Sequence, residues 1–142
     1  MDWAHLFNGF HGRIGRQTFW IAMCALAVAE IITHLIAEDV QGERLGAIVD
    51  LVFTYPEFAV ALKRAHDRNL PVWLLYIFFG AGALLDLFTV LGLAGSEEAP
   101  SMLSLAIAVP FTVFGLALLV ELGFRRGTVG PNPNGPDPLA KI

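Results

Sequence analysis

The sequence predicts an all-α membrane protein, a four-transmembrane-helix bundle, from three observations. Of its 142 residues, 56% are apolar and only 15% are charged, which lies outside the usual range of soluble domains. Four apolar stretches each come close to the length that a helix needs to cross a bilayer. The nine Lys and Arg residues are distributed very unevenly among the segments between those stretches. We therefore expect a single integral membrane domain over residues 1–142.

A short amphipathic helix is expected before the first span. Four apolar residues recur at spacings of three and four, which places them on one helical face: Trp3, Leu6, Phe7 and Phe10. Asp2 precedes them as a candidate helix cap. Such a helix either lies in the membrane interface or packs on the bundle as a short stub.

Four spans and a tail follow along the chain. The predicted spans cover residues 19–36, 45–62, 72–93 and 102–124, and an irregular Gly/Pro/Asn-rich tail covers residues 125–142. Asp50, Pro56 and Glu57 interrupt the second span, and a carboxylate at the bilayer centre costs about 2.5–3.5 kcal/mol on the insertion scale. A three-span arrangement with the N-terminus outside is the alternative. We favour four spans because three would carry Arg13 and Arg16 across the membrane.

The basic residues orient the predicted bundle. Only Arg44 lies in the loops after the first and third spans. The other eight lie before the first span, between the second and third, and after the fourth: Arg13, Arg16, Lys63, Arg64, Arg68, Arg125, Arg126 and Lys141. Because cytoplasmic loops are enriched in Lys and Arg, we expect both termini and the middle loop to be cytoplasmic.

Three blocks of sequence carry a resemblance to a known family. They read FHGRIGRQTFW at 10–20, KRAHDRN at 63–69 and GTVGPNPNGPDP at 127–138. In this order and spacing they resemble the bacterial inner-membrane family called domain of unknown function 805. The resemblance implies a four-helix polytopic protein of the bacterial cytoplasmic (inner) membrane, and it implies no activity.

The chain departs from the family pattern after the second block. A Gly and then Ser-Gly-Trp-Trp usually follow His66 and Asp67 in the family, but Asn69 and then LPVWL stand here. Asn can replace Gly in a left-handed turn, so we expect the turn itself to be kept.

All three blocks fall on the predicted cytoplasmic side, where they can meet. We expect Asp67 to pair with Arg13 or Arg16, and the tail to fold beneath the bundle over the loop at His66. The simpler interpretation of the basic residues is topology and contact with phosphate headgroups, and that of His66 is an orienting hydrogen bond. The candidate cytoplasmic interaction site comprises Arg13, Arg16, Trp20, Arg64, His66, Asp67, Asn132, Gly135 and Asp137.

Five carboxylates lie within the predicted spans: Glu30, Asp50, Glu57, Asp86 and Glu121. At about 1.5 Å per residue, Glu30, Asp50 and Asp86 lie roughly 17–21 Å from the cytoplasmic ends, in one layer beyond the midplane. They form a candidate intramembrane proton or cation site. The alternative is that they join helices as protonated or hydrogen-bonded groups. Nearer the cytoplasmic end, we expect Glu57 and Glu121 to pair with Lys63, Arg64, Arg125 or Arg126.

No phosphate-binding loop, dinucleotide fingerprint, Cys/His metal cluster or nucleophile elbow is present, so we expect no cofactor and no metal. The basic segments lack a stacking platform, which argues against nucleic acid. We favour an interaction or scaffold module with membrane lipids and a membrane or cytosolic protein as partners. The alternative is a proton- or cation-coupled carrier, as a homo-oligomer because four helices enclose little cavity. An enzyme acting on a lipid headgroup through His66 and Asp67 is less favoured.

Overall fold

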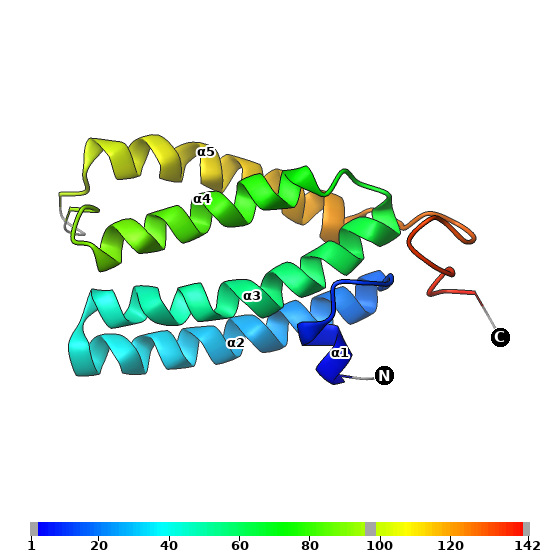
Figure 1. The fold of residues 1–142 in the computed structure, drawn as a ribbon, viewed down its shortest axis with the longest axis horizontal. Coiled ribbons are helices and arrows are strands. Elements are labelled where there is room, and N and C mark those ends of the chain that lie inside the picture. Colours follow the sequence, from blue (N-terminus) through cyan, green and yellow to red (C-terminus); the bar gives the residue numbers. More distant parts are fainter. Residues whose placement is uncertain (1–2, 96–98, 141–142) are drawn as a thin grey trace.

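The computed structural model describes residues 3–95 and 99–140, and within these ranges the chain is helical without a β-strand (Figure 1). The predicted cap Asp2 lies outside them. The described residues form five α-helices and a π-helical turn: α1 (Trp3–Asn8), α2 (Arg16–Gln41), α3 (Glu43–Arg68), α4 (Trp73–Val90), α5 (Met102–Leu119) and η1 (Val120–Phe124).

Four helical segments in the described ranges are long and apolar enough to cross a membrane, which confirms the predicted all-α class. α3 continues through Asp50, Pro56 and Glu57, the residues that made its span doubtful. The predicted ends were wrong in two places. The basic block 63–68 is the last part of α3 and not a loop, and the acidic pair Glu38 and Asp39 is still in α2.

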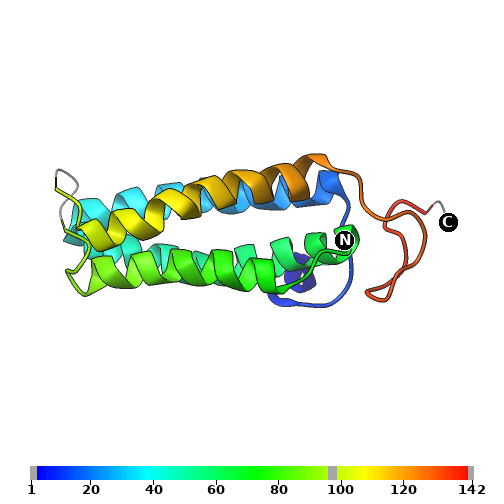
Figure 2. The ribbon, with the colours of Figure 1, turned by 90° about the horizontal axis from the view of Figure 1, so that it is seen from above.

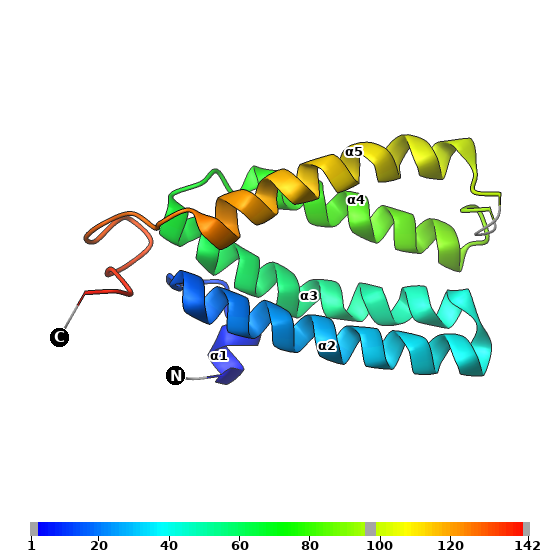
Figure 3. The same ribbon diagram turned by 180° about the vertical axis from the view of Figure 1, so that it is seen from behind.

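The helices form two antiparallel hairpins. α2 packs along α3, α4 packs along α5, and α3 joins the hairpins through its contacts with α4. Seen from opposite sides, the hairpins converge at one end and separate toward the other (Figures 1 and 3). We call the first end, with the start of α2, residues 69–72 and η1, the terminal end. The opposite end, with Gly42 and residues 91–95, is the loop end.

Buried apolar residues gather at the terminal end. The core there includes Leu6, Phe19, Val60, Leu75 and Leu122, from five different elements. Leu6 is only 3% exposed, so α1 packs on the bundle through this residue. Toward the loop end, large apolar side chains cover the outer helix surfaces. So much exposed apolar surface is unfavourable in water and fits a lipid environment.

The terminal end depends on a helix stop that the sequence indicated. Asn69 adopts a left-handed conformation with φ of 55° and ends α3. Leu70 N–H donates to Ala65 O over 2.9 Å, which satisfies a carbonyl at the helix end. The expectation that the left-handed turn is kept with Asn69 in place of Gly is thus confirmed. The tail, residues 125–140, extends beyond the bundle from this end (Figure 2).

Candidate functional site

Asp67 holds two arginines together at the terminal end. Arg13 donates through Nε and Nη2 to Asp67 Oδ1 over 3.1 and 2.9 Å. Arg64, one turn earlier in α3, donates through Nη1 to Asp67 Oδ2. The predicted pairing of Asp67 with Arg13 is therefore confirmed, while Arg16 bonds elsewhere. We call these three residues the charge triad.

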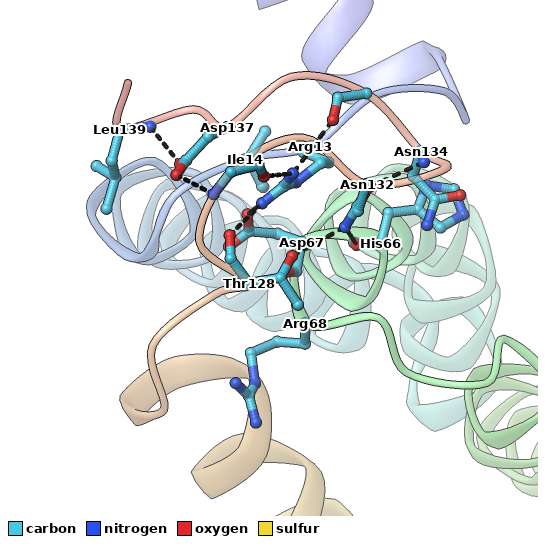
Figure 4. Close-up of polar contacts among 12 residues, drawn as sticks. Arg13, Ile14, His66, Asp67, Arg68, Thr128, Asn132, Asn134, Asp137 and Leu139 are labelled. Atoms are coloured by element: carbon cyan, nitrogen blue, oxygen red, sulfur yellow. Dashed lines mark hydrogen bonds and ion pairs between the residues drawn. The ribbon is translucent and has the colours of Figure 1, made fainter. Parts of the chain in front are cut away.

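Arg13 also fixes the tail. Its Nη1 donates to Gly130 O over 2.8 Å and to Gly135 O over 3.1 Å, and its Nη2 donates to Thr128 O over 2.7 Å. Figure 4 shows this side chain between Asp67 and the tail. One guanidinium thus donates hydrogen bonds to three backbone carbonyls of the tail that would otherwise need water as their donor.

The backbone around His66 and Asp67 completes the attachment. Thr128 donates to Asp67 O through its backbone N–H over 2.8 Å and its hydroxyl over 3.0 Å. Asn132 Nδ2 donates to His66 O over 3.0 Å. The predicted folding of the tail over this segment is confirmed. His66 itself places Nδ1 3.2 Å from Gly12 O, the orienting hydrogen bond that the sequence favoured.

Asp137 closes the tail on itself. Its carboxylate accepts hydrogen bonds from the backbone N–H groups of Leu139 and Gly130, each over 2.9 Å (Figure 4). These two bonds lower the pKa of Asp137 below its ordinary value of 3.8, because they stabilise the charged form. A depressed folded-state pKa means that this stabilisation is present at neutral pH and is lost only as the pH falls through that lowered value.

The last carbonyls of the fourth span receive donors from the other helices. A helix leaves its final carbonyl groups without partners, and their partial negative charge attracts cations. Arg64 supplies two donors here, to Leu122 O over 2.7 Å and to Arg125 O over 2.6 Å. Trp20 Nε1 donates to Gly123 O, and Arg16 Nη1 donates to Phe124 O. Arg68 Nη1 donates to Arg126 O.

A second cluster lies within the spans. Glu30, Asp50, Glu57 and Asp86 line one cavity of about 270 Å³, which we call the carboxylate cavity. The structure thus brings together the three carboxylates of the predicted layer. Its remaining walls are mainly apolar and aromatic: Thr54, Phe78, Phe79, Gly82, Leu85 and Phe111.

Glu57 departs from its prediction. Among the described residues no ion pair joins it to Lys63 or Arg64; it lines the carboxylate cavity together with Glu30 of α2. Glu121, in contrast, pairs with Arg125 over 3.0 Å as expected, and also with Arg68 over 2.5 Å.

Two further cavities adjoin the carboxylate cavity. One of about 310 Å³ lies toward the loop end, and we call it the loop-end cavity. It shares Asp50 and Asp86 with the carboxylate cavity. At its wall, His34 Nδ1 lies 2.8 Å from Asp50 Oδ1. The other cavity, of about 420 Å³, shares Glu57 and reaches Leu122 at the terminal end through apolar side chains. We call it the apolar cavity.

The three family-like blocks thus meet in one network of bonds around the charge triad. A family model described as "Protein of unknown function (DUF805)" matches residues 7–136, most of the chain. The chain belongs to the DUF805 family. The uncharacterized protein YiiR of Escherichia coli strain K12 is 31% identical to this DUF805 chain over 132 residues, 90% of the chain and 84% of YiiR. YiiR of Escherichia coli O157:H7 matches equally well. No solved structure matches.

The predicted interaction residues of this DUF805 chain are mostly occupied by bonds within the chain. The side chains of Arg13 and Arg64 are each 1% exposed and that of Asp67 is 3% exposed. Arg16 is exposed, as are Arg125 and Arg126. The network is therefore first a structural device that fastens the tail and the last helix to the bundle.

Sequence reasoning missed the capping role of these basic residues. The available signal was that helix-end carbonyls near residue 124 require donors, while guanidinium groups of other blocks lie at the same end. Among the described residues, no group of three or more His, Cys, Asp or Glu side chains could hold a metal ion.

Proposed function

We propose that this DUF805 protein is a multi-pass protein of the bacterial cytoplasmic membrane that moves protons or a small monovalent cation. One observation carries this proposal. The carboxylate cavity gathers four acidic side chains from three helices, and within the described residues no Lys or Arg pairs with any of them. Acidic groups at membrane depth are costly unless a proton or cation neutralises them.

The surroundings of the cavity suit a mobile charge. A volume of about 270 Å³ has room for about nine water molecules, since each takes about 30 Å³ in the liquid. The carboxyl groups would therefore carry protons themselves, or attract a small cation that keeps part of its water shell. Organising such a site from several helices also explains why no single segment contains a motif.

The proposal includes an orientation. The exposed arginines at the terminal end favour its placement in the cytoplasm, with the loop end outside. Asp86 would then be reached from the outside through the loop-end cavity. The apolar side chains of the apolar cavity would separate Glu57 from the cytoplasm. Transport therefore requires protons or cations to cross the apolar cavity, either on water that enters it or through a change in the packing of its side chains.

Ion flux into liposomes tests the proposal directly. The purified protein is reconstituted, and proton, sodium and potassium movement are followed with ion-sensitive dyes under an imposed gradient. We expect flux of one of these ions above that of empty liposomes. Glu30→Gln, Asp50→Asn and Asp86→Asn should each reduce it, because they remove the charge and keep the size.

Asp39→Asn is the matched control, because Asp39 is an exposed carboxylate of α2 that lines none of the three cavities. Its flux should equal that of the wild type. Failure of the wild type to move any of the three ions, with the protein correctly inserted, would contradict the proposal. Flux equal to that of the wild type in a variant that combines Glu30→Gln, Asp50→Asn and Asp86→Asn would also contradict it.

An interaction module is the second candidate function. It is favoured by exposed Arg16, Arg125 and Arg126, which leave a basic surface around the charge triad at the terminal end. Such a surface suits anionic headgroups or an acidic protein. In the same experiment, absence of flux combined with loss of a specific co-purifying protein in Arg125→Gln/Arg126→Gln would favour this function over transport.

A further inference from the structure

A separate polar cavity of about 450 Å³ lies at the terminal end, and we call it the basic cavity. α1, the segment 11–15, the first turn of α2, Lys63 and the tail all contribute to its wall. It shares no lining residue with the three cavities between the hairpins. Its described polar lining residues are His5, His11, Arg13, Gln17, Thr18 and Lys63, and no carboxylate is among these described residues.

Lys63 is the main reason to assign a ligand to this cavity. It is only 2% exposed, and its ammonium donates to Leu6 O over 2.6 Å and weakly to Ala59 O over 3.5 Å. No carboxylate among the described residues pairs with it. A buried ammonium without a counter-ion is costly, so an anion in the adjoining cavity would stabilise it.

The first turn of α2 points to the same conclusion independently. α2 has 26 residues, and its N-cap, Gly15, offers no side-chain hydrogen bond. The first bond at this end runs from Phe19 N–H to Gly15 O, so the preceding N–H groups lack partners within the helix. Gly15, Gln17 and Thr18 line the cavity. Unpaired N–H groups and the positive end of a long helix favour an anion.

We infer that the basic cavity binds a phosphate group. Lys63 supplies the charge, the first turn of α2 supplies backbone N–H donors, and the Thr18 hydroxyl and Gln17 amide supply further donors to a multi-oxygen anion. The charge triad adds to the preference, because two arginines share a single carboxylate there and leave one positive charge in excess. The proposal is independent of ion transport, since the two sites have no residue in common.

Both a lipid headgroup and a soluble phosphate ester carry this chemistry. The cavity lies where the predicted spans leave the membrane, beside α1 with its half-exposed Trp3. Binding of both sources therefore has to be measured, because each would bring the same oxygen atoms to Lys63.

Calorimetric titration of the full chain in a maltoside detergent, which contains no phosphate, tests the inference. One arm titrates inorganic phosphate, a second titrates a short-chain phosphatidic acid, and a third titrates chloride at the same ionic strength. We expect saturable binding in at least one of the first two arms and none in the third. Tighter binding of phosphatidic acid would assign the site to a headgroup, and equal affinity would assign it to the phosphate alone.

Variants locate the binding. Lys63→Met keeps the length of the side chain and should weaken phosphate binding at least about tenfold. Thr18→Val leaves the buried ammonium in place and should weaken phosphate binding severalfold. It provides the test if Lys63→Met does not fold. Arg44→Gln is the control, since it removes an exposed positive charge that does not line the cavity.

The inference would be overturned by three results. These are no saturable binding of either phosphate compound, unchanged affinity in both Lys63→Met and Thr18→Val, or an equal loss in Arg44→Gln, which would indicate general attraction to positive charge. We expect each of these variants to show the same ion flux in liposomes as the wild type, whatever its affinity for phosphate. Failure of one proposal therefore leaves the other open.

Discussion

At the scale of single residues, Asp67 has the most demanding position in the molecule. Its carboxylate is buried between two guanidinium groups, and its backbone carbonyl accepts two bonds from Thr128. Burying charges costs free energy, which good geometry and complete hydrogen bonding offset. Both conditions are met here, since Arg13 uses its three nitrogen atoms on Asp67 and the tail. Asp67 therefore couples the segment before α2, α3 and the tail.

Asp67→Asn should destabilise the folded protein by about 3–5 kcal/mol, because it leaves two buried arginines without their counter-charge. The free energy of unfolding in detergent, followed by helical circular dichroism, measures the effect. Asp39→Asn is the matched control, since Asp39 is exposed on α2 and should change stability little. Equal stability of the two variants would show that the triad does not hold the fold together.

At the scale of elements, apolar periodicity was sufficient to predict four spans, because helix length and lipid exposure depend on local composition. The ends of α2 and α3 were placed wrongly because hydropathy counts each charge as a helix boundary. It cannot register that Arg64 is neutralised by a carboxylate three residues later in the same helix, or that Lys63 bonds to Leu6 O. Those partners exist only after the elements have packed.

The candidate sites show the same division. The pairing of Asp67 with Arg13 was predictable, because both lie in blocks whose order implies that they meet at one end. The position of Glu57 was not, because its distance from the cytoplasmic end of the predicted span suggested basic partners. Whether it faces the same cavity as Glu30 depends on how α2 and α3 are rotated against each other, and amphipathicity is weak in helices surrounded by lipid.

The contact between α2 and η1 provides a test at this scale. A Cβ atom at Gly123 would lie 2.6 Å from Cζ2 of Trp20, whose indole donates to Gly123 O. Gly123→Ala should therefore destabilise the protein by about 1–3 kcal/mol through overpacking. Gly80→Ala is the matched control, because nothing lies within 4 Å of its Cβ position. Alanine there should be neutral or stabilising by up to about 1 kcal/mol.

Thermal unfolding of the two variants side by side measures this difference. Trp20 fluorescence, read in a background where Trp3 and Trp73 are replaced by phenylalanine, reports whether the indole has moved. The reverse order of stability, with Gly80→Ala the weaker protein, would contradict the close packing of η1 on α2.

At the scale of the whole molecule, the two ends of the bundle have different roles. The terminal end is fastened by the charge triad, the capped carbonyls and the tail, so it behaves as a fixed base. Toward the loop end, the hairpins separate and the loop-end cavity reaches Asp86 between them. A fixed base with a separable far end is the arrangement in which one hairpin can move against the other while the acidic groups stay in place.

The orientation and the access path can be tested together by cysteine labelling. Cys24 is first replaced by alanine, and single cysteines are placed at Val129 of the tail and at Leu93 near the loop end, which are 74% and 57% exposed. A membrane-impermeant maleimide added to intact bacterial cells or spheroplasts should label Leu93→Cys but not Val129→Cys, because positively charged segments stay in the cytoplasm. Asp86→Cys should be labelled from the same side as Leu93→Cys, since it lines the loop-end cavity. Labelling of Val129→Cys alone would indicate the inverted topology. Protection of Asp86→Cys from the maleimide on both sides would contradict the proposed path.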